Sequence, residues 1–457
     1  MPANLTTNST GAIAITPVTA ETLPPWLERA TAADREWLET TGFIAEPGTF
    51  SFVPGTAGDP ARVVFAPQPH DGVWAYAGLP RSLPEGTYRI DTPFDRDAAT
   101  AAALGWSLGS YLYSRYKKPK RGSATLVWPD QADRAEVERL TRGVFLARDL
   151  INTPAEEMGP DELAAAARDV AREAAAECTI IRGDDLLRAN YPTIHAVGRA
   201  SSRPPCLIDI RWGDPAAPKV TLVGKGVCFD TGGLDLKPAA AMLQMKKDMG
   251  GGAVVLGLAS VLMAAAAPIR LRVLIPAVEN SVSANAIRPR DIIRTRIGKT
   301  VEIGNTDAEG RLILCDALAE ADAEAPALIV DCATLTGAAR VALGPEVQAL
   351  FCNDDAVADG LLHASAAASD PLWRMPLWQP YRKLIDSKVA DFNNVAESPY
   401  AGAIIAALYL AEFVKPSTPW AHIDMMASNT RDLPGRPEGG EATGLRALYG
   451  YIRQRFG

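Results

Sequence analysis

The chain has 457 residues and a formal net charge of −8 at pH 7, and 47% of its residues are hydrophobic. A chain of this length can bury a large core without disulfide or metal staples, and two domains suit an α/β protein of this size. The acidic balance argues against nucleic acid as the main partner, because phosphate binding requires a positive surface. The one basic run, Arg115–Arg121, is interpreted as a solvated loop.

The cysteine pattern and the apolar stretches predict a cytoplasmic protein that does not enter a membrane. None of the six cysteines forms a C-x-x-C pair, and several lie in apolar runs, which is typical of a reducing compartment. The N-terminus lacks the charged and apolar regions of a secretory signal. The charge-free stretch Gly250–Ile269 is long enough to span a bilayer. It is rich in glycine and alanine, however, so we predict a buried helix packed on a sheet.

Residues 1–131 are predicted to form a small N-terminal α/β domain with a role in packing or assembly. Short β-like runs alternate with Pro/Gly turns at Ala61–Ala66, Gly72–Ala77 and Ser123–Trp128. One helix rich in Ala, Leu and aromatic residues is expected at Asp97–Tyr116. No His, Asp or Glu residues of this region have the spacing of metal ligands.

A connecting helix is predicted within residues 132–155. Apolar residues recur in steps of three and four between Val137 and Ile151, which marks one face of a helix, and Pro154 ends it. A second helix, with proline in its first turn, is expected from Pro160 to Glu177.

Residues 156–457 are predicted to form the larger domain, in which strands and helices alternate. Such alternation indicates a mainly parallel central sheet flanked by helices, with ligands at the carboxyl ends of the strands. The expected strands are Leu207–Trp212, Val220–Val223, Leu271–Ile275, Thr300–Ile303, Ala327–Asp331, Val347–Cys352 and His422–Met425. The expected helices are Gly251–Ala267, Arg311–Ala323, Asp354–Ala368, Gly402–Val414 and Thr443–Phe456.

The stretch Asn305–Leu312 (NTDAEGRL) carries two acids, Asp307 and Glu309, between an expected strand and an expected helix. In an extended backbone, residues two apart point the same way. Two carboxylates on one face repel each other unless a proton or a cation lies between them. A divalent metal is the simplest explanation. Arg311 is first interpreted as a counter-charge for the two neighbouring acids.

A second cluster follows the expected strand Val220–Val223. The sequence Gly224–Pro238 contains no G-x-x-x-x-G-K-[ST] and no G-x-G-x-x-G, so a nucleotide loop is excluded. The pair Gly232 and Gly233 instead predicts a tight turn that presents Asp230 and Lys237. Asp248 precedes the apolar helix, where an acid can also be a simple helix cap.

Taken together, the acids favour a centre with two divalent ions. Asp230, Asp248, Asp307 and Glu309 all fall at expected strand ends or helix starts, and four converging acids are unfavourable without cations. Hard oxygen ligands in this number suit two bridged metal ions. The histidines lack H-E-x-x-H and H-x-H spacing, so they are interpreted as structural.

These motifs resemble the signatures of the leucyl aminopeptidase family, the cytosolic two-metal aminopeptidases. The similarity covers roughly the last two thirds of the chain and is weak over the first domain. It rests on NTDAEGRL, on GKG-x-x-FDTGGL-x-LKP and K-x-DMGG, on Arg148–Glu162 and Asp331–Gly337, and on the tail Gly439–Tyr449.

The resemblance implies a metal-dependent exopeptidase that releases N-terminal amino acids from peptides with a free N-terminus, by two-metal activation of a bridging water. The implied metal ligands are Lys225, Asp230, Asp248, Asp307 and Glu309, with Asp230 and Glu309 reaching both ions. The ions would be Mn or Zn, or else Mg or Co. Lys237 would polarise the scissile carbonyl, and Arg311 would hold bicarbonate as the general base. The family assembles as a homohexamer.

Two departures from the family pattern concern a turn and the substrate pocket. Arg290 stands where the family has glycine in R-P-G-D, and Met425-Met426 follow the late H-x-D where the family has small residues. The pocket for the first side chain of the substrate is expected at Met245, Thr334, Leu335, Gly337 and Met426. A second hypothesis is another two-metal hydrolase, such as a dipeptidase or an amidase. A third is a non-enzymatic scaffold or DNA-binding role, against which the intact site and the acidic charge argue.

Overall fold

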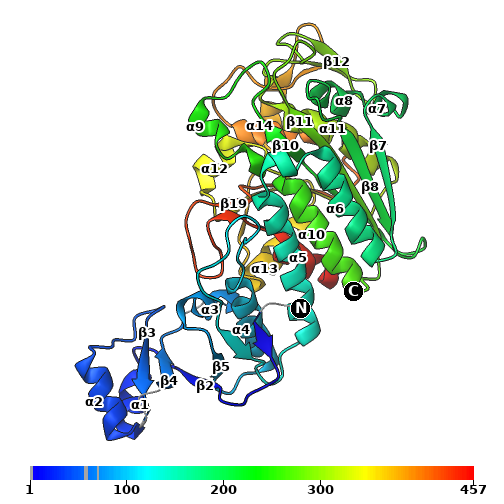
Figure 1. The fold of residues 1–457 in the computed structure, drawn as a ribbon. Helices are drawn as coiled ribbons and strands as arrows, with labels where there is room; N and C mark the ends of the chain where they lie inside the picture. Colours follow the sequence, from blue (N-terminus) through cyan, green and yellow to red (C-terminus); the bar gives the residue numbers. More distant parts are fainter. Residues whose placement is uncertain (1–3, 56–59, 69–71) are drawn as a thin grey trace. The chain divides into compact units, whose positions relative to one another are not determined.

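The structure, a computed structural model, describes residues 4–55, 60–68 and 72–457 (Figure 1). The chain divides into two compact units. The first comprises Met1–Arg142 and Arg431–Glu438, and the second comprises Gly143–Thr430 and Gly439–Gly457. The prediction of two α/β domains, the second with a mainly parallel sheet flanked by helices, is confirmed.

The first unit is built on a six-stranded sheet in the order β1-β6-β5-β2-β4-β3. Its strands are β1 (Leu5–Thr6), β2 (Ile13–Pro17), β3 (Phe50–Pro54), β4 (Pro60–Phe65), β5 (Thr87–Ile90) and β6 (Thr125–Val127). Its helices are α1 (Leu23–Arg29), α2 (Ala32–Thr40), α3 (Leu79–Ser82) and α4 (Arg96–Gly109). Trp106 of α4 is fully buried and its indole N–H donates to Ala124 O at 3.1 Å, which fixes this helix on the sheet.

Two predictions for the first unit were wrong. The expected strand Gly72–Ala77 is a short 3-10 helix, η1 (Gly72–Trp74), followed by turns. A Cβ at Gly105 of α4 would lie 1.8 Å from Val73 O, so the glycine lets this backbone lie directly on the helix instead of joining a sheet. The helix expected to run to Tyr116 ends at Gly109, with Ser110 as its C-cap.

The second unit contains a nine-stranded sheet in the order β16-β15-β18-β14-β9-β11-β8-β7, with β10 paired to β11. The central neighbours β18, β14, β9 and β11 run parallel. The pairs β11–β8, β8–β7 and β15–β18 are antiparallel. The strands are β7 (Glu177–Arg182), β8 (Cys206–Trp212), β9 (Lys219–Gly224), β10 (Gly226–Asp230), β11 (Arg270–Asn280), β14 (Leu328–Ala333), β15 (Gln348–Cys352), β16 (Leu372–Arg374) and β18 (Trp420–Asp424).

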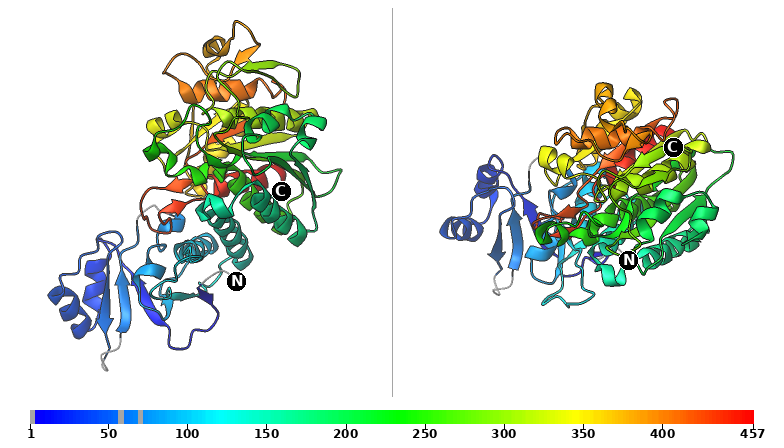
Figure 2. Two further views of the ribbon diagram at one scale, coloured as in Figure 1. Left: turned by 45° about the horizontal axis from the view of Figure 1, so that its top comes forward. Right: turned by 90° about the horizontal axis from the view of Figure 1, so that it is seen from above.

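Helices cover both faces of this sheet (Figure 2). One face carries α6 (Pro160–Glu173), α10 (Gly250–Ala264), α13 (Asp355–Ala367) and α15 (Leu445–Phe456). The other carries α8 (Pro192–Gly198), α11 (Glu309–Ala323) and α14 (Gly402–Ala411). The remaining helices are α5 (Arg134–Asn152), η2 (Ala155–Glu157), α7 (Asp185–Arg188), α9 (Ala239–Met242), η3 (Met245–Met249), α12 (Gly337–Leu343) and η4 (Gln379–Ile385).

Helix α10 is the buried helix that the sequence predicted. Among the described residues, Met245–Ala264 is long and apolar enough to cross a membrane by composition, and 89% of its most apolar window is buried inside the fold. Its small residues allow close packing: a Cβ at Gly251 would lie 2.0 Å from Cys332 O of β14. The composition of this helix is therefore explained by its place against the sheet.

Two smaller sheets complete the second unit. One joins β12 (Ile292–Arg294), β13 (Thr300–Glu302) and β17 (Phe392–Asn393), and the other joins β19 (Ser428–Asn429) and β20 (Gly439–Gly440). Strand β13 leads directly into the turn that carries Asp307 and Glu309. The three-stranded sheet therefore positions the acidic turn.

Candidate metal centre

Lys225 lies between β9 and β10, at the carboxyl end of the central sheet. Its backbone N–H donates to Cys332 O at 3.0 Å, and its carbonyl accepts from Gly252 N at 2.8 Å. A Cβ at Gly310 would lie 2.5 Å from Lys225 Cε, so only glycine leaves room for the lysine chain beside the first turn of α11. The ammonium group is thereby directed into the cluster of acids.

The Lys225 ammonium is a buried counter-ion for two of those acids. Its Nζ lies 2.6 Å from Asp248 Oδ2, 2.9 Å from Glu309 Oε1 and 3.0 Å from Thr334 O. Burial opposes its charge, but Asp248 and Glu309 outweigh burial and raise the pKa of Lys225 above its usual range. The same ion pair holds the pKa of Asp248 below its ordinary value although burial acts against it.

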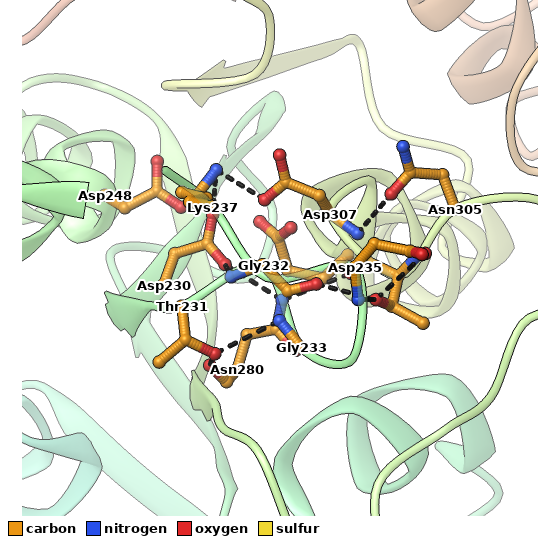
Figure 3. A network of polar contacts seen from close by, with 12 residues as sticks. Asp230, Thr231, Gly232, Gly233, Asp235, Lys237, Asp248, Asn280, Asn305 and Asp307 are labelled. Atoms are coloured by element: carbon orange, nitrogen blue, oxygen red, sulfur yellow. Dashed lines mark hydrogen bonds and ion pairs between the residues drawn. The ribbon is translucent and has the colours of Figure 1, made fainter. Parts of the chain in front are cut away.

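Lys237 is the second counter-ion (Figure 3). Its Nζ lies 2.8 Å from Asp230 Oδ2 and also contacts Asp307. The predicted glycine turn directs it there: Gly232 and Gly233 have φ values of 89° and 67°, in the left-handed region that favours glycine. Burial opposes the charge of this lysine as well, and the two carboxylates raise its pKa above the usual range.

Three acids from distant parts of the sequence converge in this site. Asp230 ends β10, Asp307 lies in the turn after β13, and Glu309 begins α11. Each offers a carboxylate oxygen, and these oxygens lie within 4.8 Å of one another. Asp248 joins the cluster through its ion pair with Lys225. The structure therefore brings together all five residues that the sequence proposed as metal ligands.

The donor set fits divalent cations. Glu309 Oε2 is buried and has no hydrogen-bond partner among the described residues. Burial first, and then the charge of Asp230, raises the pKa of Glu309 to about 8 and that of Asp307 to about 6. Two lysines do not balance four carboxylates, and hard oxygen ligands with excess negative charge are what divalent ions such as Mn²⁺ prefer.

Arg311 is a buried cation without an acidic partner among the described residues. It lies in the first turn of α11, and its Nη1 donates to Asn394 O at 2.6 Å. Its Nε has no hydrogen-bond partner, and no carboxylate of the described residues forms an ion pair with it. Burial lowers the pKa of its guanidinium. A guanidinium at a helix N-terminus is suited to hold a small anion.

The residues expected in the substrate pocket occupy different environments. Thr334 donates through Oγ1 to Asp248 Oδ1 at 2.7 Å, so its hydroxyl supports a candidate ligand. Met245 is buried in η3, Gly337 is exposed at the start of α12, and Leu335 and Met426 are half-buried. Met425 is 1% exposed, so Met426 is the one of the two methionines with accessible surface.

Sequence reasoning missed the residues that join the two acidic segments. Asn280 Nδ2 donates to Asp230 Oδ1 at 2.9 Å and to Thr306 O at 3.1 Å. Thr306 Oγ1 donates to Gly232 O at 2.6 Å, and Asp235 Oδ2 accepts from Thr306 N at 2.7 Å. Asn280 could have been found, because it ends a strand in register with Asp230, but the expected strand stopped at Ile275.

A central parallel sheet with acids, two lysines and a buried arginine at the carboxyl ends of its strands fits a metal-dependent hydrolase of the α/β class. Residues 145–449 match the model of the cytosol aminopeptidase family catalytic domain, and residues 13–129 match the M17 aminopeptidase N-terminal domain. The chain therefore belongs to the cytosol aminopeptidase family, as the motifs predicted. It is a metal-dependent aminopeptidase.

Individual relatives agree with this assignment. The chain is 42% identical to peptidase B from Serratia proteamaculans over 360 residues, which are 76% of this chain and 84% of the relative. It is similar to the crystal structure of cytosol aminopeptidase from Coxiella burnetii, with a TM-score of 0.96 and 48% identity over 99% of both chains. It is also similar to the bottromycin maturation enzyme BotP in complex with Mn, with a TM-score of 0.87, 33% identity and coverage of 97% and 99%.

Proposed function

We propose that Lys225, Asp230, Asp248, Asp307 and Glu309 hold two divalent ions and that the chain removes N-terminal residues from peptides at this centre. The observation that supports this best is the cluster of Asp230, Asp307 and Glu309, in which Glu309 has a buried oxygen that lacks a partner among the described residues. Asp230 and Glu309 would reach both ions, Asp307 one ion, and Lys225 and Asp248 the other. Lys225 would bind its ion as the neutral amine, after losing the proton that it carries in the ion-free chain. Ions bound there would polarise the scissile carbonyl and lower the pKa of a bound water.

Two charged side chains would act on the substrate directly. Lys237, kept protonated by Asp230 and Asp307, would stabilise negative charge that develops on the carbonyl oxygen. Arg311, buried without a carboxylate partner, would bind bicarbonate as the general base. The lysine supplies fixed positive charge and the arginine supplies the place for a proton acceptor, so the two roles are separable by mutation.

The ion, the assembly and the compartment belong to the same proposal. Mn²⁺ is the first ion to test because a related structure is titled as a complex with Mn, and Zn²⁺, Mg²⁺ and Co²⁺ suit the same oxygen ligands. We infer that the chain forms a homohexamer. We also infer that it works in the cytosol, in line with the name of the Coxiella relative, a cytosol aminopeptidase. Sedimentation of the 48.6 kDa chain as a monomer would remove the hexamer.

The decisive experiment is hydrolysis of aminoacyl p-nitroanilides and dipeptides with Mn²⁺, Zn²⁺, Co²⁺ or EDTA. We expect metal-dependent release of the first residue, and no hydrolysis of the matched N-acetylated substrates. Equal rates on free and acetylated substrates would contradict an aminopeptidase and favour an amidase. Inactivity with every ion would refute the proposed centre.

A second experiment tests the role of Arg311. Adding bicarbonate to a bicarbonate-free assay should raise the rate of hydrolysis by the wild type and not that by Arg311→Met.

The first side chain of the substrate is proposed to lie among Met245, Thr334, Leu335, Gly337 and Met426. Met425 and Met426 stand where the family pattern has small residues, and Met426 is the half-buried one of the two. Met426→Ala should widen the pocket and raise kcat/KM for bulky first residues relative to alanine. An unchanged order of preference would remove Met426 from the pocket. Met425→Leu is the matched control, because Met425 is buried.

A further inference from the structure

The segment Asp391–Val395 lies against the base of the acidic turn. Strand β17 pairs parallel with β13, with Phe392 opposite Val301. Asp391 Oδ2 accepts from Thr300 N at 2.7 Å, and the backbone N–H of Asn394 donates to Glu302 O at 3.0 Å. The segment is therefore fixed to the strand from which the turn departs.

The side chain of Asn394 is bonded to the turn itself. Its Oδ1 accepts from Gly304 N at 2.8 Å and from Asn305 N at 3.2 Å. Its Nδ2 donates to Asn305 O at 2.7 Å and, at 3.4 Å, to Ala308 O. Asn394 has no exposed surface. These contacts span the backbone from the end of β13 to the residue before Glu309.

The backbone of Asn394 reaches the anion-binding arginine. Its carbonyl oxygen accepts from Arg311 Nη1 at 2.6 Å, and Arg311 Nε has no partner in the described part of the chain. One residue therefore contacts both the turn that carries Asp307 and Glu309 and the guanidinium that follows them.

This combination of contacts requires an amide side chain. Residues 303–308 belong to no helix or strand, and buried backbone N–H and C=O groups must find partners outside regular structure. Asparagine offers an acceptor and a donor on one rigid group, whereas a carboxylate offers only acceptors. A side chain that satisfies both kinds of backbone group holds the turn in one conformation before any ion binds.

We propose that Asn394 is a positioning residue for the metal centre: its side chain holds the turn that presents Asp307 and Glu309, and its carbonyl orients Arg311. This inference rests on the proposed function, because it assigns the purpose of the contacts to metal binding. Residues that support metal ligands in this way typically contribute 10- to 100-fold to metal affinity or activity.

The test compares three variants of the full chain. Asn394→Ala removes the amide, and Asn394→Leu removes the polar atoms while filling the same space. Asn353→Ala is the control, because Asn353 also bonds two backbone groups, Thr418 O at 2.9 Å and Trp420 N at 2.8 Å. Trp420 begins β18, so these contacts lie at the amino end of that strand, away from the acids. Thermal unfolding of each variant reports its folded fraction.

The measured quantity is Mn²⁺ affinity by equilibrium dialysis, together with kcat at saturating Mn²⁺. We expect Mn²⁺ to bind about 10- to 100-fold more weakly to both Asn394 variants and kcat to fall, with wild-type values for Asn353→Ala. Folded Asn394 variants with wild-type affinity and kcat would reduce Asn394 to a structural role. A wild-type chain that binds no Mn²⁺ would instead refute the proposed function, and this inference with it.

A second measurement uses the wild type alone and covers the case in which the variants do not fold. Hydrogen exchange of the peptide that contains Gly304 and Asn305 is followed after EDTA treatment. Because Asn394 accepts from both amides, we expect them to stay protected without metal. Free exchange of these amides in the chelated, folded chain would show that the side chain does not hold the turn, and would overturn the inference.

Discussion

Lys225 Nζ lies 2.6 Å from Asp248 Oδ2, and each side chain is only 3% exposed. A buried charge without a partner costs several kcal/mol, so each of these groups depends on the other. Lys237 forms a similar ion pair with Asp230, with 2.8 Å between Nζ and Oδ2. The fold thus supplies internal counter-ions for a cluster of acids, and these lysines keep the acids in place when divalent ions are removed.

Removal of metal should therefore leave the chain folded. We expect EDTA-treated protein to keep its far-UV circular dichroism and to unfold cooperatively, because two ammonium groups partly neutralise the acids. Mn²⁺ should raise Tm, since a ligand that binds only the folded state stabilises it by about 3 kcal/mol at 100 times Kd. Loss of cooperative unfolding in EDTA would contradict this role of the lysines.

Removal of the Lys225 ammonium should destabilise the chelated chain strongly. Lys225→Met leaves Asp248 and Glu309 without their cation, and breaking a buried pair costs about 3–5 kcal/mol. The matched control is Lys415→Met, whose ion pair with Asp322 involves a lysine that is 65% exposed and should contribute at most about 1 kcal/mol. Urea unfolding in EDTA measures both. Equal losses in the two variants would show that burial of the Lys225 pair has no special effect.

Loss of the Arg311 guanidinium should separate catalysis from metal binding. Arg311→Met removes a buried cation that forms no ion pair with any carboxylate of the described residues, so the ligand cluster keeps its ion pairs. We expect kcat to fall by about 10²–10⁴, the usual contribution of general base catalysis, while Mn²⁺ stoichiometry stays unchanged. Single-turnover kinetics measures the fall in the catalytic rate, and equilibrium dialysis measures the Mn²⁺ stoichiometry. A variant that loses its metal would place Arg311 among the residues that support the ligands.

The limits of sequence analysis are clear from particular residues. Asp307 and Glu309 were found because they lie two apart in a strand-to-helix segment, and Asp230 and Asp248 because each follows or precedes an apolar run. Asn394 could not be found this way. Its partners lie more than 80 residues earlier, in a turn without periodicity, and no local pattern marks a side chain that serves a distant backbone.

The segment Gly226–Asp230 illustrates a second limit. No strand was predicted there, yet the segment forms β10 beside β11. The pairing partner, the extension of β11 to Asn280, was also missed, because the expected strand stopped at Ile275, before Pro276. The mainly parallel sheet and the helices that cover it followed from the alternation of strands and helices, because that pattern extends over whole elements.

A buried pair next to the site should give the chain a specific pH dependence. His422 Nδ1 lies 2.5 Å from Asp331 Oδ1 across β18 and β14, and both side chains are fully buried. Burial lowers the pKa of His422, and the charge of Arg311 lowers it slightly further. Asp331, with a smaller contribution from Asp424, outweighs both and raises the pKa above 6.5. The added stability is therefore complete below about pH 6.5 and is lost as pH rises through the folded-state value.

Asp331→Asn isolates this effect. The amide keeps an acceptor for Trp420 Nε1, which lies 2.7 Å from Asp331 Oδ2, but it removes the charge that favours protonated His422. In EDTA, the free energy of unfolding should be higher for the wild type than for the variant. This difference should be larger at pH 6 than at pH 8. Urea titrations at the two pH values give both differences. A difference that does not change with pH would show that His422 stays neutral in the folded chain.

Arg290 is predicted to be a strained residue whose side chain partly offsets the strain. Its φ is 74°, in the left-handed region where the family pattern has glycine, and its Nη1 lies 2.6 Å from Glu302 Oε1. Arg290→Ala keeps the strain and loses the ion pair, whereas Arg290→Gly loses both. Because a non-glycine residue in this conformation costs about 1–2 kcal/mol, the glycine variant should be more stable than the alanine variant by about that amount. Urea unfolding of the pair measures the difference, and equal stabilities would show that the backbone at this turn relaxes without cost.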